Sequence, residues 1–139
     1  MSNKDYSAKH IFSLDACTNC QLCADVCPAV QASGSGKLSG VHRIQALKKI
    51  KKGRMGGLWK LLGNKVPTEA EMKEYAETVF RCTLCGHCQV VCPVGIELKD
   101  IWLSLRQDMN KSEAAPSKVG MILDNLESSH NVFDEENEE

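Results

Sequence analysis

The stretch RCTLCGHCQVVCPVG, residues 81–95, sets four cysteines at offsets of 0, 3, 6 and 10 residues and follows the last one with proline. The stretch ACTNCQLCADVCPAV, residues 16–30, repeats the same offsets and the same proline. Together the two stretches hold all eight cysteines of the 139-residue chain. Two identical spacings that account for every cysteine predict two equivalent binding sites.

The spacing is typical of the thiolate ligands of a 4Fe-4S cluster. Three cysteines separated by two residues can wrap three corners of a cubic cluster, but a tight local loop cannot supply the fourth corner. In two-cluster ferredoxins with this spacing the last cysteine ligates the other cluster. The proline fixes the backbone where the chain turns away and removes a competing donor. The sequence therefore predicts two 4Fe-4S clusters, the first held by Cys17, Cys20, Cys23 and Cys92 and the second by Cys82, Cys85, Cys88 and Cys27.

Other uses of these residues are open at this point. Structural zinc also takes CxxC pairs, but a tetrahedral zinc site needs two pairs and no terminal Cys-Pro. Disulfides suit secreted chains, whereas residues 1–15 contain no apolar core followed by a cleavage site. A 3Fe-4S or mixed cluster is a further variant. His87, between Cys85 and Cys88, is a conceivable Rieske-type ligand, but the thiolates already complete the set, so an exposed position near the cluster is the simpler interpretation.

The length predicts one domain with a modest core. We expect a leader over residues 1–11, with weak order as far as residue 15, a domain over residues 12–130 and an acidic tail over residues 131–139. The net charge is −1, and no apolar run approaches the roughly 20 residues that span a bilayer. Without a secretory signal, we expect a cytoplasmic protein whose thiols stay reduced.

The rest of the chain predicts helices. Apolar residues recur at helical spacing over residues 41–52, 98–109 and 119–126. Thr68 stands three residues before Glu71, a capping box that predicts the start of another helix. Sustained strand alternation is absent, so the predicted fold class is all-α. The expected apolar faces are Val41, Ile44, Leu47 and Ile50; Met72, Tyr75, Ala76, Val79 and Phe80; Leu98, Ile101, Trp102, Leu105 and Met109; and Val119, Ile122, Leu123 and Leu126.

A basic segment lies between the cysteine sets. From Lys37 to Lys65 there are nine Lys and Arg residues and no Asp or Glu. Trp59 and neighbouring leucines stand among these charges, which favours a docking surface for an acidic protein partner or an anionic membrane. The alternative is that the apolar residues belong to the core and the lysines are solvated. No motif or aromatic platform indicates nucleic-acid binding.

The stretches CTNCQLCADVCPA and CTLCGHCQVVCPVGIELKDIWLSLRQ, with helical spacing between them, resemble the α-helical ferredoxin module of heterodisulfide reductase C subunits and of the N-terminal part of D subunits. Similar modules occur in the K subunit of the sulfite-reductase-associated membrane complex and in glycolate or lactate oxidase iron–sulfur subunits. The resemblance covers about residues 12–130. It implies a helical ferredoxin that passes electrons between a flavin, haem or iron–sulfur subunit and a catalytic subunit rich in Cys-Cys-Gly motifs.

The resemblance implies an electron-transfer subunit of a heterodisulfide-reductase-like complex. This chain contains no Cys-Cys-Gly triplet, so the disulfide-cleaving site of the larger subunits is absent from it, and we expect no catalytic residues. One alternative is the N-terminal part of a catalytic Cys-Cys-Gly-type reductase, since the ending NVFDEENEE resembles the linker of fused relatives. The other is a free soluble ferredoxin. As a complex subunit, the protein is expected in the cytoplasm or peripheral to the inner face of the membrane.

Overall fold

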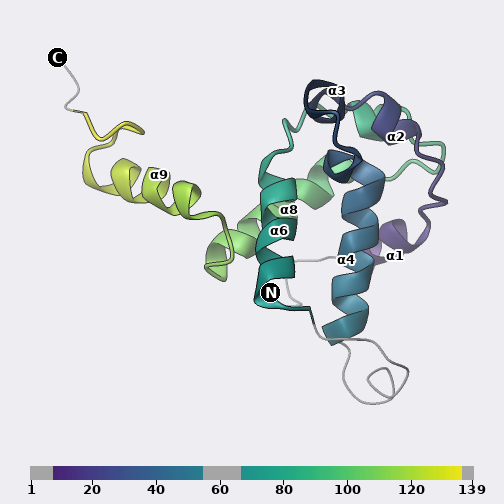
Figure 1. The fold of residues 1–139 in the computed structure, drawn as a ribbon, viewed down its shortest axis with the longest axis horizontal. Coiled ribbons are helices and arrows are strands. Elements are labelled where there is room, and N and C mark those ends of the chain that lie inside the picture. Colours follow the sequence, from purple (N-terminus) through teal and green to yellow (C-terminus); the bar gives the residue numbers. More distant parts are fainter. Residues whose placement is uncertain (1–7, 55–66, 136–139) are drawn as a thin grey trace.

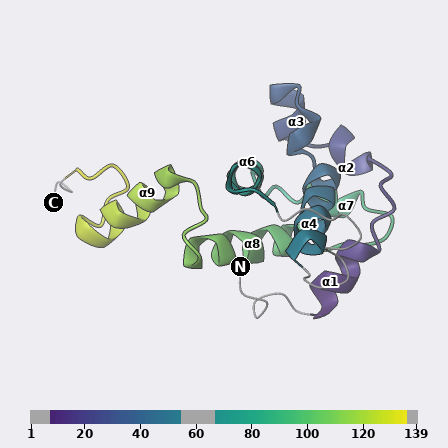
Figure 2. The same cartoon turned by 60° about the horizontal axis from the view of Figure 1, so that its bottom comes forward.

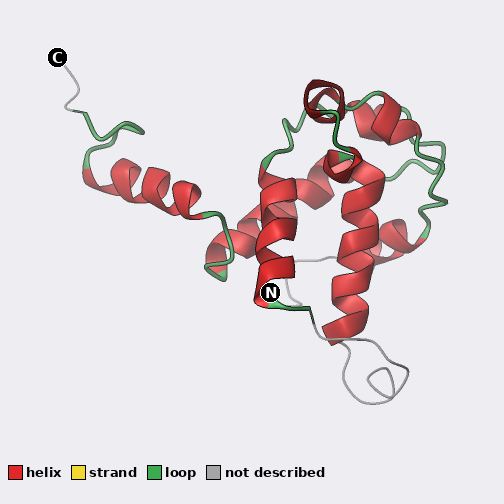
Figure 3. Cartoon of the chain, in the orientation of Figure 1, coloured by secondary structure: helices red, strands yellow, loops and turns green. Residues whose placement is uncertain are grey.

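The computed structural model describes residues 8–54 and 67–135, and within these ranges the chain is all-helical, as predicted (Figure 3). Longer helices form the body of the fold (Figure 1), and the short helices α2, α3 and α7 lie within or next to the two cysteine sets in the sequence. In chain order the elements are α1 (Ala8–Asp15), α2 (Leu22–Asp25), α3 (Pro28–Ser33), the 3-10 helix η1 (Gly36–Leu38), α4 (Gly40–Arg54), α6 (Glu69–Phe80), α7 (His87–Val90), α8 (Leu98–Lys111) and α9 (Ser117–Ser128).

The core lies between α4, α6 and α8. Figure 1 shows α4 and α6 standing side by side with α8 crossing behind them, and Figure 2 shows α8 running along one side of both. Trp102, at the centre of α8, is 0% exposed. Burying an aromatic side chain of this size is one of the larger single contributions to a core. The buried cluster consists of Leu14, Ile44, Leu47, Ile50, Tyr75, Ala76, Val79, Ile96, Leu98, Ile101, Trp102, Leu105 and Met109.

The predicted helix at Thr68 begins as expected. The Thr68 hydroxyl oxygen accepts a hydrogen bond from the Glu71 backbone N–H at 3.2 Å, and a Glu71 carboxylate oxygen accepts one from the Thr68 backbone N–H at 2.9 Å. These two bonds satisfy amides that have no partner inside the helix. The cap therefore sets the start of α6, whose other end leads directly into the second cysteine set.

The expectation of weak order through residue 15 is wrong for α1. This helix packs Leu14 into the core at 2% exposure, immediately before the first cysteine set. A single helix of eight residues has little intrinsic stability in water. Its order therefore comes from contacts with distant residues, which the local sequence does not reveal.

Helix α9 forms as predicted, but its apolar side chains do not enter the core. Figures 1 and 2 both show it standing away from the other helices. Met121 is 63% exposed, and Ile122, Leu123 and Leu126 are each close to 40% exposed. The helical period therefore predicted the helix correctly, whereas the tertiary structure leaves its apolar face largely exposed.

The described part of the basic segment is partly neutralised or buried. Lys37 forms an ion pair with Glu74 at 2.7 Å, and Lys49 pairs with Glu71 at 3.3 Å, both across to α6. Arg43 is buried. Trp59 and the leucines beside it lie outside the described residues. Exposed ion pairs such as those of Lys37 and Lys49 contribute little to stability. None of the helices over residues 8–54 and 67–135 is long and apolar enough to cross a membrane.

Candidate functional site

Both cysteine loops have the same backbone shape. In the first loop Asn19 and Gln21, on either side of the middle cysteine, have φ angles of 61° and 67°; in the second, Leu84 and Gly86 have φ angles of 55° and 81°. Turns with such conformations can point successive backbone N–H groups toward one side, a concavity of the kind that binds anions and iron–sulfur sites. Three of these four positions hold a residue with a side chain, at a cost of about 1–2 kcal/mol each.

Gly86 should be sensitive to substitution because of its positive φ. A Cβ at this position would meet no atom within 4 Å, so the expected loss for Gly86→Ala, about 1–2 kcal/mol of folding free energy, comes only from the positive φ. Gly36→Ala is the matched control, because its Cβ also meets nothing and its φ is not positive. Urea unfolding of both variants measures the difference, and equal stability would contradict the backbone explanation.

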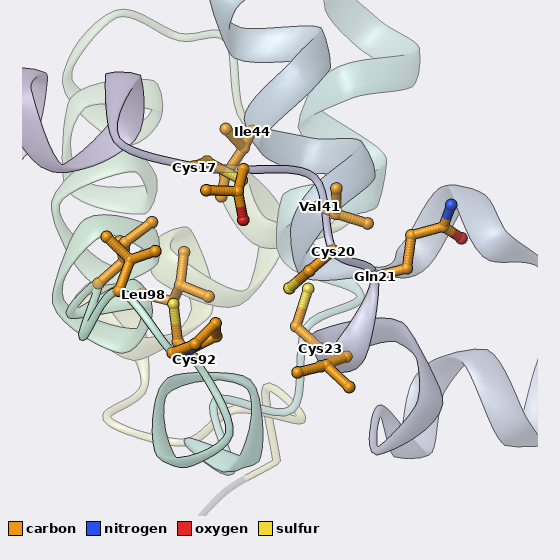
Figure 4. Close-up of a pocket in the computed structure, with 13 residues that line it drawn as sticks. Cys17, Cys20, Gln21, Cys23, Val41, Ile44, Cys92 and Leu98 are labelled. Atoms are coloured by element: carbon orange, nitrogen blue, oxygen red, sulfur yellow. The ribbon is translucent and has the colours of Figure 1, made fainter.

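The first cavity is lined by Cys17, Cys20, Cys23 and Cys92. Figure 4 shows Cys20 and Cys23 on one side and Cys92 on another, with their sulfur atoms turned toward the space between them. The Gln21 side chain points away from that space (Figure 4). Cys17 and Cys20 come from the loop between α1 and α2 and Cys23 comes from α2 itself, whereas Cys92 comes from the distant segment after α7.

The second cavity is lined by Cys27, Cys82, Cys85 and Cys88. The second cavity has a volume of about 390 Å³ and the first a volume of about 360 Å³, and both values include space that is open to solvent. Nearly equal hollows with the same four-thiol lining suit two copies of one group. The structure thus brings the cysteines together in the two groups of four that the spacing predicts.

Two chain segments cross between the cavities. Cys27 precedes α3, and Pro28 occupies the first position of that helix, where a proline fits without losing a hydrogen bond. Cys92 precedes Pro93 and a turn in which Gly95 has a φ of 71°. Helices α2 and α7 contact each other. Because of this contact, the last cysteine of each set reaches the cavity of the other set.

The thiols differ in acidity. Burial, followed by repulsion from neighbouring thiolates with Cys82 first, raises the pKa of Cys88 to about 11. Burial likewise raises the pKa of Cys23. The backbone N–H of His87 lowers the pKa of Cys85 by stabilising its thiolate. A metal ion overrides these shifts because a coordinating thiol is deprotonated outright, and its positive charge removes the repulsion among the sulfurs.

Buried donors next to the second cavity test whether an anionic group fits there. Arg43 Nη2 and Trp102 Nε1 are buried and have no hydrogen-bond partner among the described residues. Both residues line the second cavity. Buried donors are usually satisfied, and a cluster surrounded by thiolates offers sulfur acceptors. The residues present therefore fit a 4Fe-4S cluster.

Arg43 is not among the residues predicted for the site, although its position in the sequence carries a signal. Arg43 lies four residues before Leu47 and seven before Ile50, on the apolar stripe of its own helix. A charged residue on such a stripe is buried, and a buried charge needs a partner. His87, which was considered as a ligand, has an exposed side chain at the edge of the second cavity.

The thiols do not converge as they would on one metal ion. Within residues 8–54 and 67–135, no three His, Cys, Asp or Glu side chains form a site for a single ion. All eight cysteines are free thiols.

The chain is similar in sequence to several known proteins. The chain is 31% identical over 135 residues to the D subunit of the dihydromethanophenazine:CoB–CoM heterodisulfide reductase of Methanosarcina acetivorans, a match that covers 96% of this chain and 33% of that protein. It is 28% identical over 104 residues to the Hdr-like menaquinol oxidoreductase iron-sulfur subunit 2 of Archaeoglobus fulgidus, covering 70% of this chain and 18% of that protein. A probable membrane-anchored ferredoxin of Chromohalobacter salexigens is 26% identical over 141 residues, covering 88% of this chain and 20% of that protein.

The chain thus spans about a third of the length of the heterodisulfide reductase relatives it matches. No solved structure matches it. The family of the 4Fe-4S dicluster domain matches residues 13–96, a range that includes both cysteine sets. The chain therefore belongs to the 4Fe-4S dicluster domain family and contains two 4Fe-4S clusters.

Proposed function

We propose that this chain is an electron-transfer subunit that relays single electrons through its two clusters inside a heterodisulfide-reductase-like redox complex. Cys17, Cys20, Cys23 and Cys92 ligate the first cluster, and Cys82, Cys85, Cys88 and Cys27 ligate the second. The observation that carries the proposal is the pair of neighbouring four-thiol cavities, each completed by a cysteine from the other set. A bound 4Fe-4S cluster accepts and releases one electron at a time.

The protein contributes the spacing of the clusters and their surroundings. Gly40 lines the second cavity, and a Cβ built on Gly40 would lie 3.4 Å from the Sγ of Cys23 in the first. The two cavities are therefore separated here by little more than one backbone segment, so clusters held in them would have a short path for an electron. Burial, local charge and hydrogen bonds to sulfur then set the two potentials.

The relatives suggest the kind of complex. One relative is named as a subunit of a heterodisulfide reductase and another as an Hdr-like iron-sulfur subunit. Because both are subunits, they imply partner subunits for this chain too. We propose a catalytic partner that bears Cys-Cys-Gly motifs, and a flavin, haem or iron–sulfur subunit as the other electron partner. Residues 37–65 are the proposed docking segment, and the complex is placed in the cytoplasm or at the inner face of the membrane.

The proposal is tested by anaerobic isolation from the source cell followed by native mass spectrometry. We expect a stoichiometric complex with a Cys-Cys-Gly-bearing subunit. When the isolated chain is loaded with iron and sulfide, reduced with dithionite and mixed with that subunit, the absorbance of its clusters should return to the oxidised level in stopped-flow experiments.

Two outcomes support the other candidate functions. A loaded monomer that exchanges electrons with several unrelated acceptors indicates a free ferredoxin carrier. A longer polypeptide that continues past Glu139 into a Cys-Cys-Gly region indicates the N-terminal part of a catalytic reductase. Either result contradicts the proposal of a separate subunit.

A further inference from the structure

The two cavities differ in the charge of the residues around the thiols. Beside its cysteines, the first cavity is lined by neutral residues, among them Val41, Ile44, Ile96 and Leu98. Of the described residues, no Lys, Arg, His, Asp or Glu lines it. The second cavity is lined by Arg43, Lys99 and His87, and none of the described carboxylates lines it. The positive charge is therefore on one side only.

Of these residues, Arg43 contributes most to the difference in charge between the two cavities, because its charge is shielded from water. The residue is 1% exposed. Its Nε donates to the backbone oxygen of Thr78 at 2.7 Å, and its guanidinium carbon lies 5.8 Å from the centre of the Trp102 ring. These contacts hold the guanidinium on the wall of the second cavity, where the field of a charge is weakly screened.

No counter-ion balances this charge within the described residues. Arg43 is absent from the ion pairs there, and its Nη2 has no hydrogen-bond acceptor. An isolated buried charge is strongly unfavourable. The cavity that Arg43 lines offers such an anion, the set of four thiolates with the cluster that they would hold.

A second arginine lies beside the same loop. Arg106 donates to the backbone oxygens of Val79, Phe80 and Cys82 from α8, and its guanidinium carbon lies 5.2 Å from the centre of the Phe80 ring. Its positive charge therefore stands next to Cys82, the first cysteine of the second set. It adds to the field of Arg43 at the second cavity.

Positive charge near an iron–sulfur cluster stabilises the more negative, reduced state and so raises the reduction potential. Net charge and hydrogen bonds to sulfur are established determinants of such potentials. Hydrogen bonds that involve an ionised group are stronger than neutral ones. The buried guanidinium of Arg43 therefore acts on the second cluster through its charge, and no charged residue lines the first cavity among the described residues.

We propose that the cluster held by Cys82, Cys85, Cys88 and Cys27 has the higher reduction potential of the two, and that the buried charge of Arg43 sets the difference. The first cluster then accepts an electron from a one-electron donor, which is a reduced flavin, haem or iron–sulfur centre. This electron moves on from the first cluster to the second. In this step the first cluster is oxidised by one electron and the second is reduced by one. The direction of relay rests on the proposed function, whereas the order of the potentials is a property of the loaded chain alone.

The test is a potentiometric titration of the anaerobically loaded chain, followed by electron paramagnetic resonance. The wild-type protein should show two one-electron steps. Arg43→Gln should lower the midpoint of the higher step by at least 59 mV, which is a tenfold change in a one-electron equilibrium, and leave the lower step in place. Arg43→Lys keeps the charge and should shift the higher step by less than half as much.

Two further variants identify the clusters. Thr18 is exposed at the first cavity. The variant Thr18→Lys adds a positive charge there, so it should raise the midpoint potential of the lower step and reduce the difference between the two potentials. Lys52→Gln is the matched control for charge removal, because Lys52 is exposed on the same helix and lies nine residues, about 13 Å, beyond Arg43. It should move neither step by more than a few millivolts.

Several results would overturn the proposal. These are a shift confined to the lower step in Arg43→Gln, the absence of any shift, or an equal shift in Arg43→Lys. If Arg43→Gln does not take up iron, Lys99→Gln provides the same test from an exposed position at the second cavity, with a smaller fall of the higher step expected. Because the titration uses no partner, a failed partner search leaves this result unaffected, and an inverted order of potentials leaves the existence of the complex unaffected.

Discussion

Replacing Cys27 with alanine is expected to abolish the second cluster, whose other thiolates lie more than 50 residues away in the sequence, and to spare the first. The loaded protein should fall from about eight irons to about four, since each cluster holds four. The reason is that Cys27 lines the cavity of Cys82, Cys85 and Cys88, not that of its own set. Without its fourth thiolate the second cluster is no longer fully held and is expected to dissociate.

Alkylation of the variant followed by peptide mass spectrometry identifies the cluster that is lost. Iodoacetamide should modify Cys82, Cys85 and Cys88 in Cys27→Ala and leave the first set protected. Cys92→Ala is the reciprocal control, in which Cys17 and its set should become reactive. If Cys27→Ala instead exposes the thiols of its own set, each set binds its cluster locally and the crossing is wrong.

Removing the iron is expected to unfold the cysteine loops while the helical core persists. None of α2, α3 and α7 contributes a fully buried side chain. Their order therefore depends on the clusters, because metal binding free energy is folding free energy in sites of this kind. The backbone strain of the loops opposes the folded arrangement once iron is gone.

Amide hydrogen exchange, measured before and after anaerobic chelation, separates the two regions. Protection in residues 16–33 and 82–95 should fall at least about a hundredfold, which corresponds to roughly 3 kcal/mol, while α8 loses less than tenfold. Trp102 and its neighbours on α8 keep their core contacts in the absence of a cluster. Addition of iron and sulfide should restore the loops. Equal loss in α8 and in the loops would show that the clusters and the core form one cooperative unit.

Much of the fold follows from local patterns. The stripe of Leu98, Ile101 and Leu105 predicted a buried helix, and the capping box at Thr68 predicted where α6 begins; the structure confirms both. Local patterns failed where burial depends on distant residues. Leu14 is buried although its surroundings resemble a leader, and the apolar face of α9 is exposed although its period resembles that of a core helix.

In the candidate site, too, some features follow from local sequence patterns and others depend on distant residues. Cysteine spacing is a local property, and it predicted the grouping of the thiols because the loop geometry of this cluster type is imposed by the cluster itself. The charged wall of the second cavity could not be predicted in this way. It depends on the rotation of α4 and on the packing of Arg43 against Trp102, a residue of α8.

The sequence by itself determined the class of the fold, the number and kind of clusters and the grouping of distant cysteines, because these follow from residue type and spacing along the chain. The tertiary structure alone decided that the surroundings of the two clusters are unequal. The physical reason is that an electrostatic field depends on distance and burial in space, and residues far apart in sequence, such as Arg43 and Cys85, come to the same cavity only when the helices pack.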